Sequence, residues 1–274
     1  MTYSIVGYCP KEKEWGIAVQ SKFLGVGSVV PWAKAGVGAV ATQSYANTSY
    51  GPNGLELMEQ GKTAEEVVQL LTEADEDREF RQFGVIDAQG NAASYTGSKC
   101  YDWAGGKTGT HYAAQGNILV SGETVSQMAQ IFEKTEGVLA ERLLKALAAA
   151  QAAGGDSRGQ QSASLLVVKE KGGYGGFNDR YIDLRVEDHP RPIEELTRIY
   201  QLQQLYFAPT KSENVVEIAG ETASALQVEL ERLGYYKGDL QEALTTYIHT
   251  ENFEGREQSA GFIDRDVLEY MKKQ

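Results

Sequence analysis

The chain has 274 residues, 42% of them hydrophobic, which is ordinary for a globular protein and long enough for one substantial domain and a small second one. Its formal charge of −12 argues against nucleic acid or an anionic membrane surface as a partner. No apolar run approaches the ~18 residues of a membrane span, and no leader resembles a signal peptide, so we expect a cytoplasmic protein. The two cysteines, Cys9 and Cys100, lack metal-binding neighbours, and we expect neither a metal nor a cofactor.

The chain begins with Met1-Thr2, and a strand-like segment follows at once. An initiator methionine is removed when the second residue is small, so Thr2 is expected to become the mature N-terminus. A terminal threonine carries a hydroxyl nucleophile and a free α-amine, a base near neutral pH, on one residue. The alternative is that Thr2 is simply a residue with good strand propensity.

Hydrophobic patterns and turn residues predict strands at these positions of the first 206 residues: 2–8, 15–20, 27–33, 37–43, 81–88, 91–96, 112–120, 162–168 and 181–186. Between them we predict a short helix at 55–60, a helix opened by a Thr63/Glu66 capping box, a helix pair before Gly154, and a last helix after Asp188. Hairpins that alternate with helix pairs favour an α+β fold of two stacked antiparallel sheets with helices outside, rather than a doubly wound parallel sheet.

A family resemblance rests on the end of the second predicted strand. Ala18-Val19-Gln20-Ser21-Lys22 looks like the Ala-Val-Asp-Ser-Arg stretch of proteasome β-type N-terminal-nucleophile (Ntn) hydrolases. Residues 20–41, 161–168 and 183–206 resemble more closely an uncharacterised bacterial domain-of-unknown-function family with an Ntn-hydrolase-like fold. The resemblance covers roughly residues 1–206 and implies a four-layer αββα Ntn-hydrolase-like sandwich.

The resemblance also implies a nucleophile and its neighbours. Thr2 would attack an amide carbonyl, with its own amine as the base. Gln20 stands where the Ntn pattern has an aspartate, which removes one charge from the expected network. Lys34 lies near the place of the Ntn lysine, where a cation would lower the pKa of the Thr2 amine. A solvated lysine at a strand end is the alternative for Lys34.

Four further candidates lie at strand ends. Gln43 and Ser44 end the fourth predicted strand, where Ntn folds offer backbone N–H groups to an oxyanion; they are equally suited to a plain turn. Ser162 opens the late strand that brings a serine towards the nucleophile in such folds, or it is an edge residue without a role. Asn117 could present its amide to a substrate, or belong to a glycine-bearing bulge.

One motif is set aside. Residues 155–159, Gly-Asp-Ser-Arg-Gly, fit the G-x-S-x-G pattern of a nucleophile elbow, which requires a strand before the serine and a helix after it. Here the predicted helix comes first and the strand second. We therefore interpret the motif as a loop that ends the helix.

The composition changes near residue 207, since residues 207–274 hold 7 Lys/Arg and 13 Asp/Glu. We predict a first domain at 1–207, a polar linker at 208–220 and a small all-α domain at 221–274. The segment 233–238, Leu-Gly-Tyr-Tyr-Lys-Gly, resembles the peptidoglycan-binding-like domain. The resemblance implies a glycan-peptide ligand for Tyr235 and Tyr236, and the alternative is that both tyrosines anchor docking or dimerisation.

These features together favour an Ntn-type hydrolase that cleaves an amide bond in a small or peptide-like substrate, such as a muropeptide fragment of the cell wall. We expect a homo-oligomer. The rival hypothesis is a non-catalytic binding protein on the same fold, whose C-terminal domain serves docking or glycan-peptide binding.

Overall fold

The computed structural model describes residues 2–274, so the predicted removal of Met1 lies outside the described residues. The chain divides into two compact units, Met1–Thr197 and Arg198–Gln274. The boundary falls within helix α5 (Pro192–Phe207), whose two halves therefore belong to different units. Within residues 2–274, no helix combines the length and the apolar character that a membrane crossing requires.

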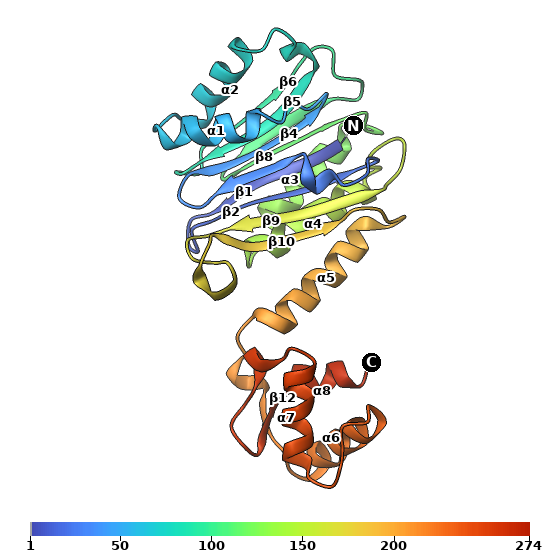
Figure 1. Ribbon diagram of the computed structural model, residues 1–274. Coiled ribbons are helices and arrows are strands. Elements are labelled where there is room, and N and C mark those ends of the chain that lie inside the picture. Colours follow the sequence, from blue (N-terminus) through green and yellow to red (C-terminus); the bar gives the residue numbers. More distant parts are fainter. Residues whose placement is uncertain (1) are drawn as a thin grey trace. The chain divides into compact units, whose positions relative to one another are not determined.

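The first unit contains a six-stranded antiparallel sheet with the strand order β10-β9-β2-β1-β8-β7 (Figure 1). Its two middle strands, β1 (Thr2–Cys9) and β2 (Glu14–Ser21), are buried along their whole length. The other strands are β7 (Gly105–Gly109), β8 (Tyr112–Asn117), β9 (Ser162–Val168) and β10 (Arg180–Val186). The start of β1 is thus enclosed by strands on both sides.

A second antiparallel sheet has four strands in the order β3-β4-β5-β6. They are β3 (Pro31–Lys34), β4 (Gly38–Ser44), β5 (Arg81–Asp87) and β6 (Ala92–Thr96). This sheet contacts the first along all four strands: β3 faces β2 and β9, β4 and β5 face β1 and β8, and β6 faces β7 and β8. Apolar side chains such as Ile17, Val19 and Ile86 fill the space between the two sheets.

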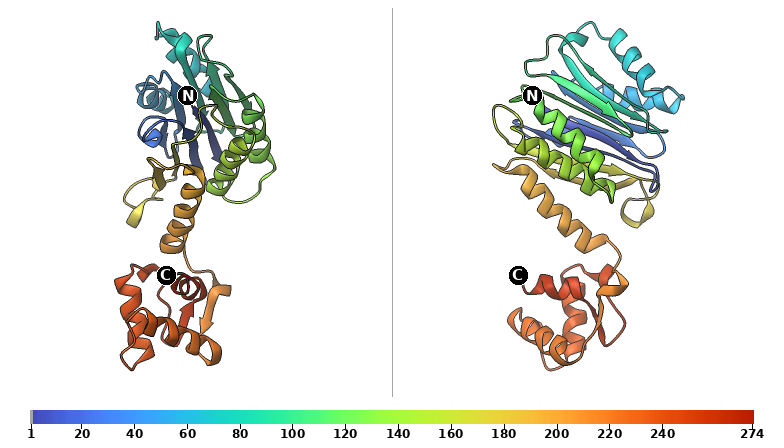
Figure 2. Two further views of the ribbon diagram at one scale, coloured as in Figure 1. Left: turned by 90° about the vertical axis from the view of Figure 1, so that its right-hand side faces the viewer. Right: turned by 180° about the vertical axis from the view of Figure 1, so that it is seen from behind.

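Helix pairs cover both sheets. Helices α1 (Tyr50–Glu59) and α2 (Ala64–Glu73) pack on the four-stranded sheet. Helices α3 (Glu123–Lys134) and α4 (Leu139–Ala152) pack on the six-stranded sheet, as the two views of Figure 2 show. The capping box of Thr63 and Glu66 opens α2, as predicted. The expected mixed fold of antiparallel sheets and helices is therefore confirmed.

Two local predictions were wrong for reasons of backbone chemistry. The segment predicted as a strand at 27–33 begins with the 3-10 turn η1 (Val26–Ser28), and pairing starts only at Pro31. The helix predicted at 55–60 begins earlier, since α1 starts at Tyr50 and runs through Gly51-Pro52. This dipeptide is typical of a turn, but proline also fits the first turn of a helix. Gly51 is required there, since a Cβ atom would lie 2.2 Å from the Trp32 ring.

The second unit is mainly helical, with α6 (Gly220–Arg232), α7 (Leu240–Thr250) and α8 (Arg265–Met271). It is not all-α, because β11 (Val215–Glu217) pairs antiparallel with β12 (Phe262–Asp264). Residues 208–220, predicted as a linker, hold the turn η4 (Ser212–Asn214) and β11. The polar residues of this segment concealed the short β-branched pair that forms the strand.

The core of the second unit begins in the last turns of α5. Tyr206 stacks on Phe253 with ring centroids 4.8 Å apart. Arg256 is almost fully buried; its guanidinium donates to the carbonyls of Gln204 and Leu205, at 2.7 Å each, and to Asp264 Oδ2 at 2.7 Å. The last carbonyls of α5 are therefore satisfied by a side chain of the second unit.

Candidate functional site

A pocket of about 510 Å³ opens beside the start of β1. It lies where strand ends and loops of the two sheets meet. Its lining residues are Thr2, Ser21, Lys22, Phe23, Val26, Val29, Val30, Gln43, Ser44, Tyr45, Ala46, Arg81 and Arg158. Three of the predicted site residues, Thr2, Gln43 and Ser44, are among them.

Thr2 is held from both sides by its place in the sheet. It pairs with Ser21 of β2 and with Asn117 of β8, and its side chain is only 4% exposed. The Thr2 hydroxyl oxygen lies 3.0 Å from Ser21 Oγ, within hydrogen-bond distance. A threonine hydroxyl is thus fixed at the pocket wall beside a second hydroxyl.

A network of buried side-chain amides forms hydrogen bonds to the backbone carbonyl of Thr2. Gln43 Nε2 donates to the Thr2 carbonyl at 3.3 Å and to Gln82 Oε1 at 2.8 Å. Asn117 Nδ2 donates to Gln82 Oε1 at 2.7 Å and reaches the same Thr2 carbonyl at 3.5 Å. Gln43 and Asn117 therefore position Thr2, and Asn117 does not itself line the pocket.

Ser44 ends β4 in the left-handed region, with φ of 73°. A non-glycine residue there is strained and turns the chain sharply, so that Ser44, Tyr45 and Ala46 line the pocket. Arg81 stabilises this segment, because its Nη1 donates to the Tyr45 carbonyl at 2.7 Å. The Tyr45 N–H donates to the Phe80 carbonyl at 3.4 Å, so both backbone polar groups of Tyr45 hold the segment in place.

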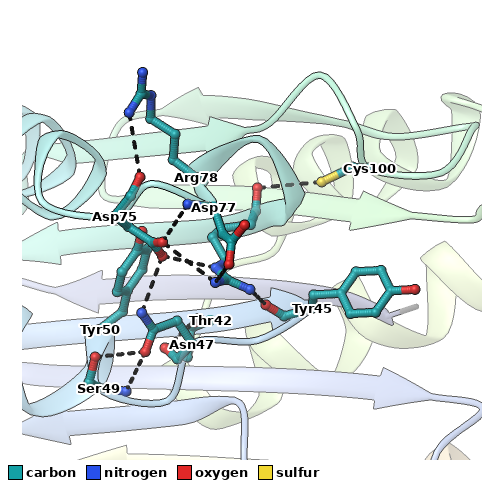
Figure 3. Close-up of polar contacts among 10 residues, drawn as sticks. Thr42, Tyr45, Asn47, Ser49, Tyr50, Asp75, Asp77, Arg78 and Cys100 are labelled. Atoms are coloured by element: carbon teal, nitrogen blue, oxygen red, sulfur yellow. Dashed lines mark hydrogen bonds and ion pairs between the residues drawn. The ribbon is translucent and has the colours of Figure 1, made fainter.

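Asp75 is the centre of the polar cluster behind this wall (Figure 3). It accepts hydrogen bonds from Arg81 Nε at 2.9 Å, from the Tyr50 hydroxyl at 2.9 Å and from Asn47 Nδ2 at 3.2 Å. Arg81 is the largest cause that holds the pKa of Asp75 well below its usual range, with help from Asn47 and Tyr50 and against the effect of burial. The pKa of Tyr50 is raised, first because the tyrosine is partly buried and then because its hydroxyl donates to the Asp75 carboxylate.

This cluster makes the first unit sensitive to acid. Because the folded pKa of Asp75 is lowered, its stabilising effect is complete above the unfolded pKa of about 3.9 and is lost as the pH falls towards the folded value. We expect Asp75→Asn to lower the melting temperature at neutral pH and to flatten its decline below about pH 4. Thermal unfolding of both proteins across this range tests the expectation, with the mostly exposed Asp77→Asn as control. The expectation would be contradicted if the melting temperatures of wild type and Asp75→Asn fell equally steeply as the pH is lowered below about 4.

A second charged group, the ion pair of Asp156 and Arg158, adjoins the pocket. Asp156 is fully buried at its side chain and binds Arg158 at both oxygens, with Nη2 to Oδ2 at 2.7 Å and Nε to Oδ1 at 3.1 Å. The same Oδ2 accepts the backbone N–H of Lys22 at 3.2 Å. This carboxylate therefore ties Arg158 to the segment that follows Ser21, and both cations line the pocket.

Ser162 lies behind the pocket and does not line it. Its hydroxyl donates to the Phe23 carbonyl at 2.5 Å and accepts the Val26 N–H at 3.1 Å. Both partners belong to the loop that forms one pocket wall. Ser162 is therefore placed to position this loop, and the predicted direct catalytic role is not supported by its contacts.

Removing the Ser162 hydroxyl should loosen the loop. We expect Ser162→Ala to reduce the free energy of unfolding by about 1–3 kcal/mol, because a buried carbonyl and N–H lose their partner. Hydrogen exchange should speed up at residues 23–26. Ser164→Ala is the matched control, since the Ser164 hydroxyl is buried without a hydrogen-bond partner among the described residues. Equal effects of the two variants would contradict the positioning role.

Two predicted site residues lie elsewhere. Lys34 pairs with Gly38 at the far end of β3, is 53% exposed at its side chain and forms an ion pair with Glu59. The tight turn between β3 and β4 sets this register, which sends Lys34 to the end of the hairpin opposite Ser44. The prediction that Lys34 lies near Thr2 was therefore wrong.

Gln20 is also turned away from the pocket. Side chains alternate along a strand, so Ser21 shares the face of Thr2 while Gln20 shares that of Tyr3, its partner in the ladder. Tyr3 points to α4, where its hydroxyl donates to Gln151. Gln20 is fully buried, and neither amide atom has a hydrogen-bond partner among the described residues. Its expected contact with substrate or oxyanion is contradicted.

In the second unit, Tyr235 and Tyr236 pack mainly against their own core. Tyr235 meets Tyr247 edge-on at 5.2 Å between ring centroids, and its hydroxyl donates to Glu251 at 2.6 Å. This hydrogen bond, more than burial, raises the pKa of Tyr235 to about 12. Both tyrosines therefore have structural partners, and their ligand or docking role remains a prediction.

The cations of the pocket were missed by the sequence reasoning. Lys22 directly follows Ser21 and was noted only as part of a family resemblance. Arg158 belongs to the glycine-flanked motif that was set aside as a loop, and Arg81 begins a predicted strand. The described residues contain no cluster of histidine, cysteine and acidic side chains suited to a metal.

Comparisons with known proteins agree with this two-part organisation. Residues 2–196 match a model described as "Family of unknown function (DUF1028)", and residues 206–271 match one described as "Putative peptidoglycan binding domain". A crystal structure of a DUF1028 protein from Silicibacter pomeroyi is 29% identical, covers 81% of this chain and 92% of that chain, and has a TM-score of 0.68. Anbu (ancestral beta-subunit) from Yersinia bercovieri is 13% identical, covers 73% of this chain and 93% of that chain, and has a TM-score of 0.35.

Among proteins with curated functions, none matches the chain. The family of the larger part is nevertheless clear, since its match extends over more than half of all residues and coincides with the first compact unit. The chain belongs to the DUF1028 family of unknown function over residues 2–196 and continues, at 206–271, with a domain of the peptidoglycan-binding type.

Proposed function

We propose that the first unit is an Ntn-type amide hydrolase with Thr2 as its nucleophile. The observation that carries the proposal is the fixed Thr2 hydroxyl, which lines the pocket and lies 3.0 Å from Ser21 Oγ. Two contacting antiparallel sheets with a helix pair on each support the Ntn-like four-layer arrangement. The nucleophile would then lie at the start of a central strand, where removal of Met1 frees the α-amine.

The proposed reaction has two steps. The Thr2 hydroxyl attacks the substrate carbonyl, its proton passes to the α-amine and then to the leaving nitrogen, and the C–N bond breaks to leave an ester on Thr2. Water, deprotonated by the same amine, hydrolyses the ester and restores the hydroxyl. Ser21 is close enough to Thr2 to relay or orient the proton.

Other pocket residues would assist these steps. The backbone N–H groups of Ser44 and Ala46 are the candidate donors to the oxyanion, because the left-handed turn at Ser44 brings the segment to the pocket wall while the Tyr45 N–H donates to the Phe80 carbonyl. Arg158 takes over the role first assigned to Lys34, since a cation in the pocket lowers the pKa of a nearby amine.

A covalent probe tests this proposal directly. A β-lactone or an epoxyketone reacts with an N-terminal threonine, and the epoxyketone requires both the hydroxyl and the free amine. Intact mass of the purified protein shows whether Met1 is absent, and peptide mapping locates the adduct. An adduct on Thr2 supports the proposal. A protein that has lost Met1 and still forms no adduct contradicts it and favours the non-catalytic binding protein.

The second unit bears on the substrate class. Its likeness to peptidoglycan-binding domains supports a glycan peptide or a muropeptide as the ligand, as first expected from the sequence. In this proposal the small domain binds or docks and the first unit cleaves. Assembly as a homo-oligomer is part of the same proposal, and analytical ultracentrifugation of the full chain tests it.

A further inference from the structure

The pocket beside Thr2 carries positive charge in a chain whose overall charge is −12. Lys22, Arg81 and Arg158 line it, and no aspartate or glutamate is among its lining residues. These cations come from three separate parts of the sequence, so a local run of charge does not explain them. A cavity lined by one sign of charge concentrates ligands of the opposite sign.

Carboxylates outside the lining offset the two arginines. Arg81 forms ion pairs with Asp75 and Asp77, and Arg158 forms one with Asp156, and none of these acids lines the pocket. Lys22 differs, because it forms no ion pair with another residue of 2–274; its ammonium group donates to the Gln160 carbonyl at 3.4 Å. Lys22 is therefore the lining cation whose charge no carboxylate of residues 2–274 offsets through an ion pair.

Lys22 is also close to the proposed reaction centre. It directly follows Ser21, whose hydroxyl lies 3.0 Å from that of Thr2. Its backbone N–H is bound by the carboxylate that holds Arg158, so the lysine and this arginine lie on one wall. In an N-acyl amino acid the carboxylate is two bonds from the amide nitrogen. A cation that lines the same pocket as the nucleophile is therefore suited to bind such a carboxylate.

The rest of the pocket is apolar. Phe23, Val26, Val29 and Val30 line it next to the cations. This surface is suited to an acyl chain or an apolar side chain. A phosphate group would instead favour the N-terminus of an α-helix, and none of the α-helices in residues 2–274 begins at a lining residue.

We propose that the pocket selects amides that carry a free carboxylate next to the scissile bond, namely N-acyl amino acids and peptides cut beside their carboxyl end, and that Lys22 binds this carboxylate. The assignment deepens the proposed function and rests on it for the cleavage step. Carboxylate binding itself does not require catalysis, so it is measured separately.

The test compares two matched probes on the full-length protein. N-acyl-alanine with short and medium acyl chains, in both enantiomers, is titrated against the corresponding N-acyl-alaninamide by calorimetry or ligand-observed NMR. Each pair differs only in its terminal group, an anionic carboxylate in one probe and a neutral carboxamide of similar size in the other. The proteins are wild type, Thr2→Ala to prevent turnover, Lys22→Gln and Arg158→Lys. Lys11→Gln is the control, because Lys11 is a highly exposed lysine of the β1–β2 turn and does not line the pocket.

We expect wild type and Thr2→Ala to bind a carboxylate probe at least about tenfold more tightly than its amide partner, as one charge-assisted contact allows. Lys22→Gln should abolish this preference while Lys11→Gln retains it. Equal binding of acid and amide, no binding of any acid probe, or an unchanged preference in Lys22→Gln would overturn the proposal.

The same samples separate this inference from the proposed function. If carboxylate preference depends on Lys22 and no covalent adduct forms on Thr2, the carboxylate site is supported and the proposed hydrolase function is contradicted. An adduct on Thr2 without a preference for carboxylate probes supports the hydrolase function and contradicts the proposed carboxylate site. Arg158→Lys retains a partner for the buried Asp156, so this variant should remain folded.

Discussion

Replacement of Thr2 by alanine is expected to abolish amide hydrolysis and covalent labelling. The variant lacks the attacking oxygen, and we expect a loss of at least about 10³-fold in kcat/KM, or ~4 kcal/mol of barrier. The fold should survive, because Thr2 loses only the contact of its hydroxyl with Ser21 while its backbone pairs remain in β1. The measurement is labelling by the epoxyketone, followed by turnover of the N-acyl-alanine probes.

Two controls make this result specific. Thr2→Ser keeps a hydroxyl and an amine at the same position, so it should still be labelled. Thr108→Ala removes an exposed threonine of β7 that does not line the pocket, and it should behave as wild type. Full labelling of Thr2→Ala would show that another residue is the nucleophile, which would leave Thr2 a strand residue without a catalytic role.

The largest expected effect on stability is in the second unit. Arg256→Leu removes the partner of Asp264, whose side chain is fully buried, and takes away the donors to two carbonyls of α5. An unpaired buried carboxylate costs about 3–5 kcal/mol. A unit of this size has a total stability of only about 4–12 kcal/mol, so the variant should leave much of it unfolded near body temperature.

Hydrogen exchange resolves this loss by region. Protection should fall in α6, α7 and α8 of Arg256→Leu while β1 and β2 of the first unit remain protected. Arg265→Leu is the control, since Arg265 is exposed at the start of α8. Adding Asp264→Asn to Arg256→Leu should restore part of the stability, because the uncompensated charge is gone. Unchanged protection in the single variant would show that the buried pair contributes little.

Local patterns in the sequence were enough to find most strands and helices. The strand predicted at 162–168 has the bounds of β9, and the capping box predicted at Thr63 and Glu66 opens α2. β7 was missed because Gly105-Gly106-Lys107-Thr108-Gly109 has no apolar side chain to show a pattern. It is a strand because its backbone pairs with β8, which is a tertiary effect.

The site was harder to predict, because it depends on register and on loops. Thr2 was predicted from the Met1-Thr2 start and Ser44 from its place at the end of a strand, and both line the pocket. Gln20 was misplaced since the ladder pairs Ser21, not Gln20, with Thr2, and a shift of one residue reverses the face. Arg158 was missed because its position depends on the buried Asp156, a contact between loops that no local pattern shows.

The pairing of β11 with β12 has a consequence for how the second unit forms during synthesis. Val215 pairs with Asp264, and Gln204 and Leu205 accept from Arg256, so the earliest and the latest residues of this unit depend on each other. Such non-local contacts slow folding, because a long loop must close before they stabilise anything. The first unit can complete its sheets while the ribosome still holds the C-terminal residues. The second unit cannot form its sheet before Asp264 has left the ribosome, and a chain that stops before this residue would leave β11 without its partner strand and Arg256 without its buried carboxylate.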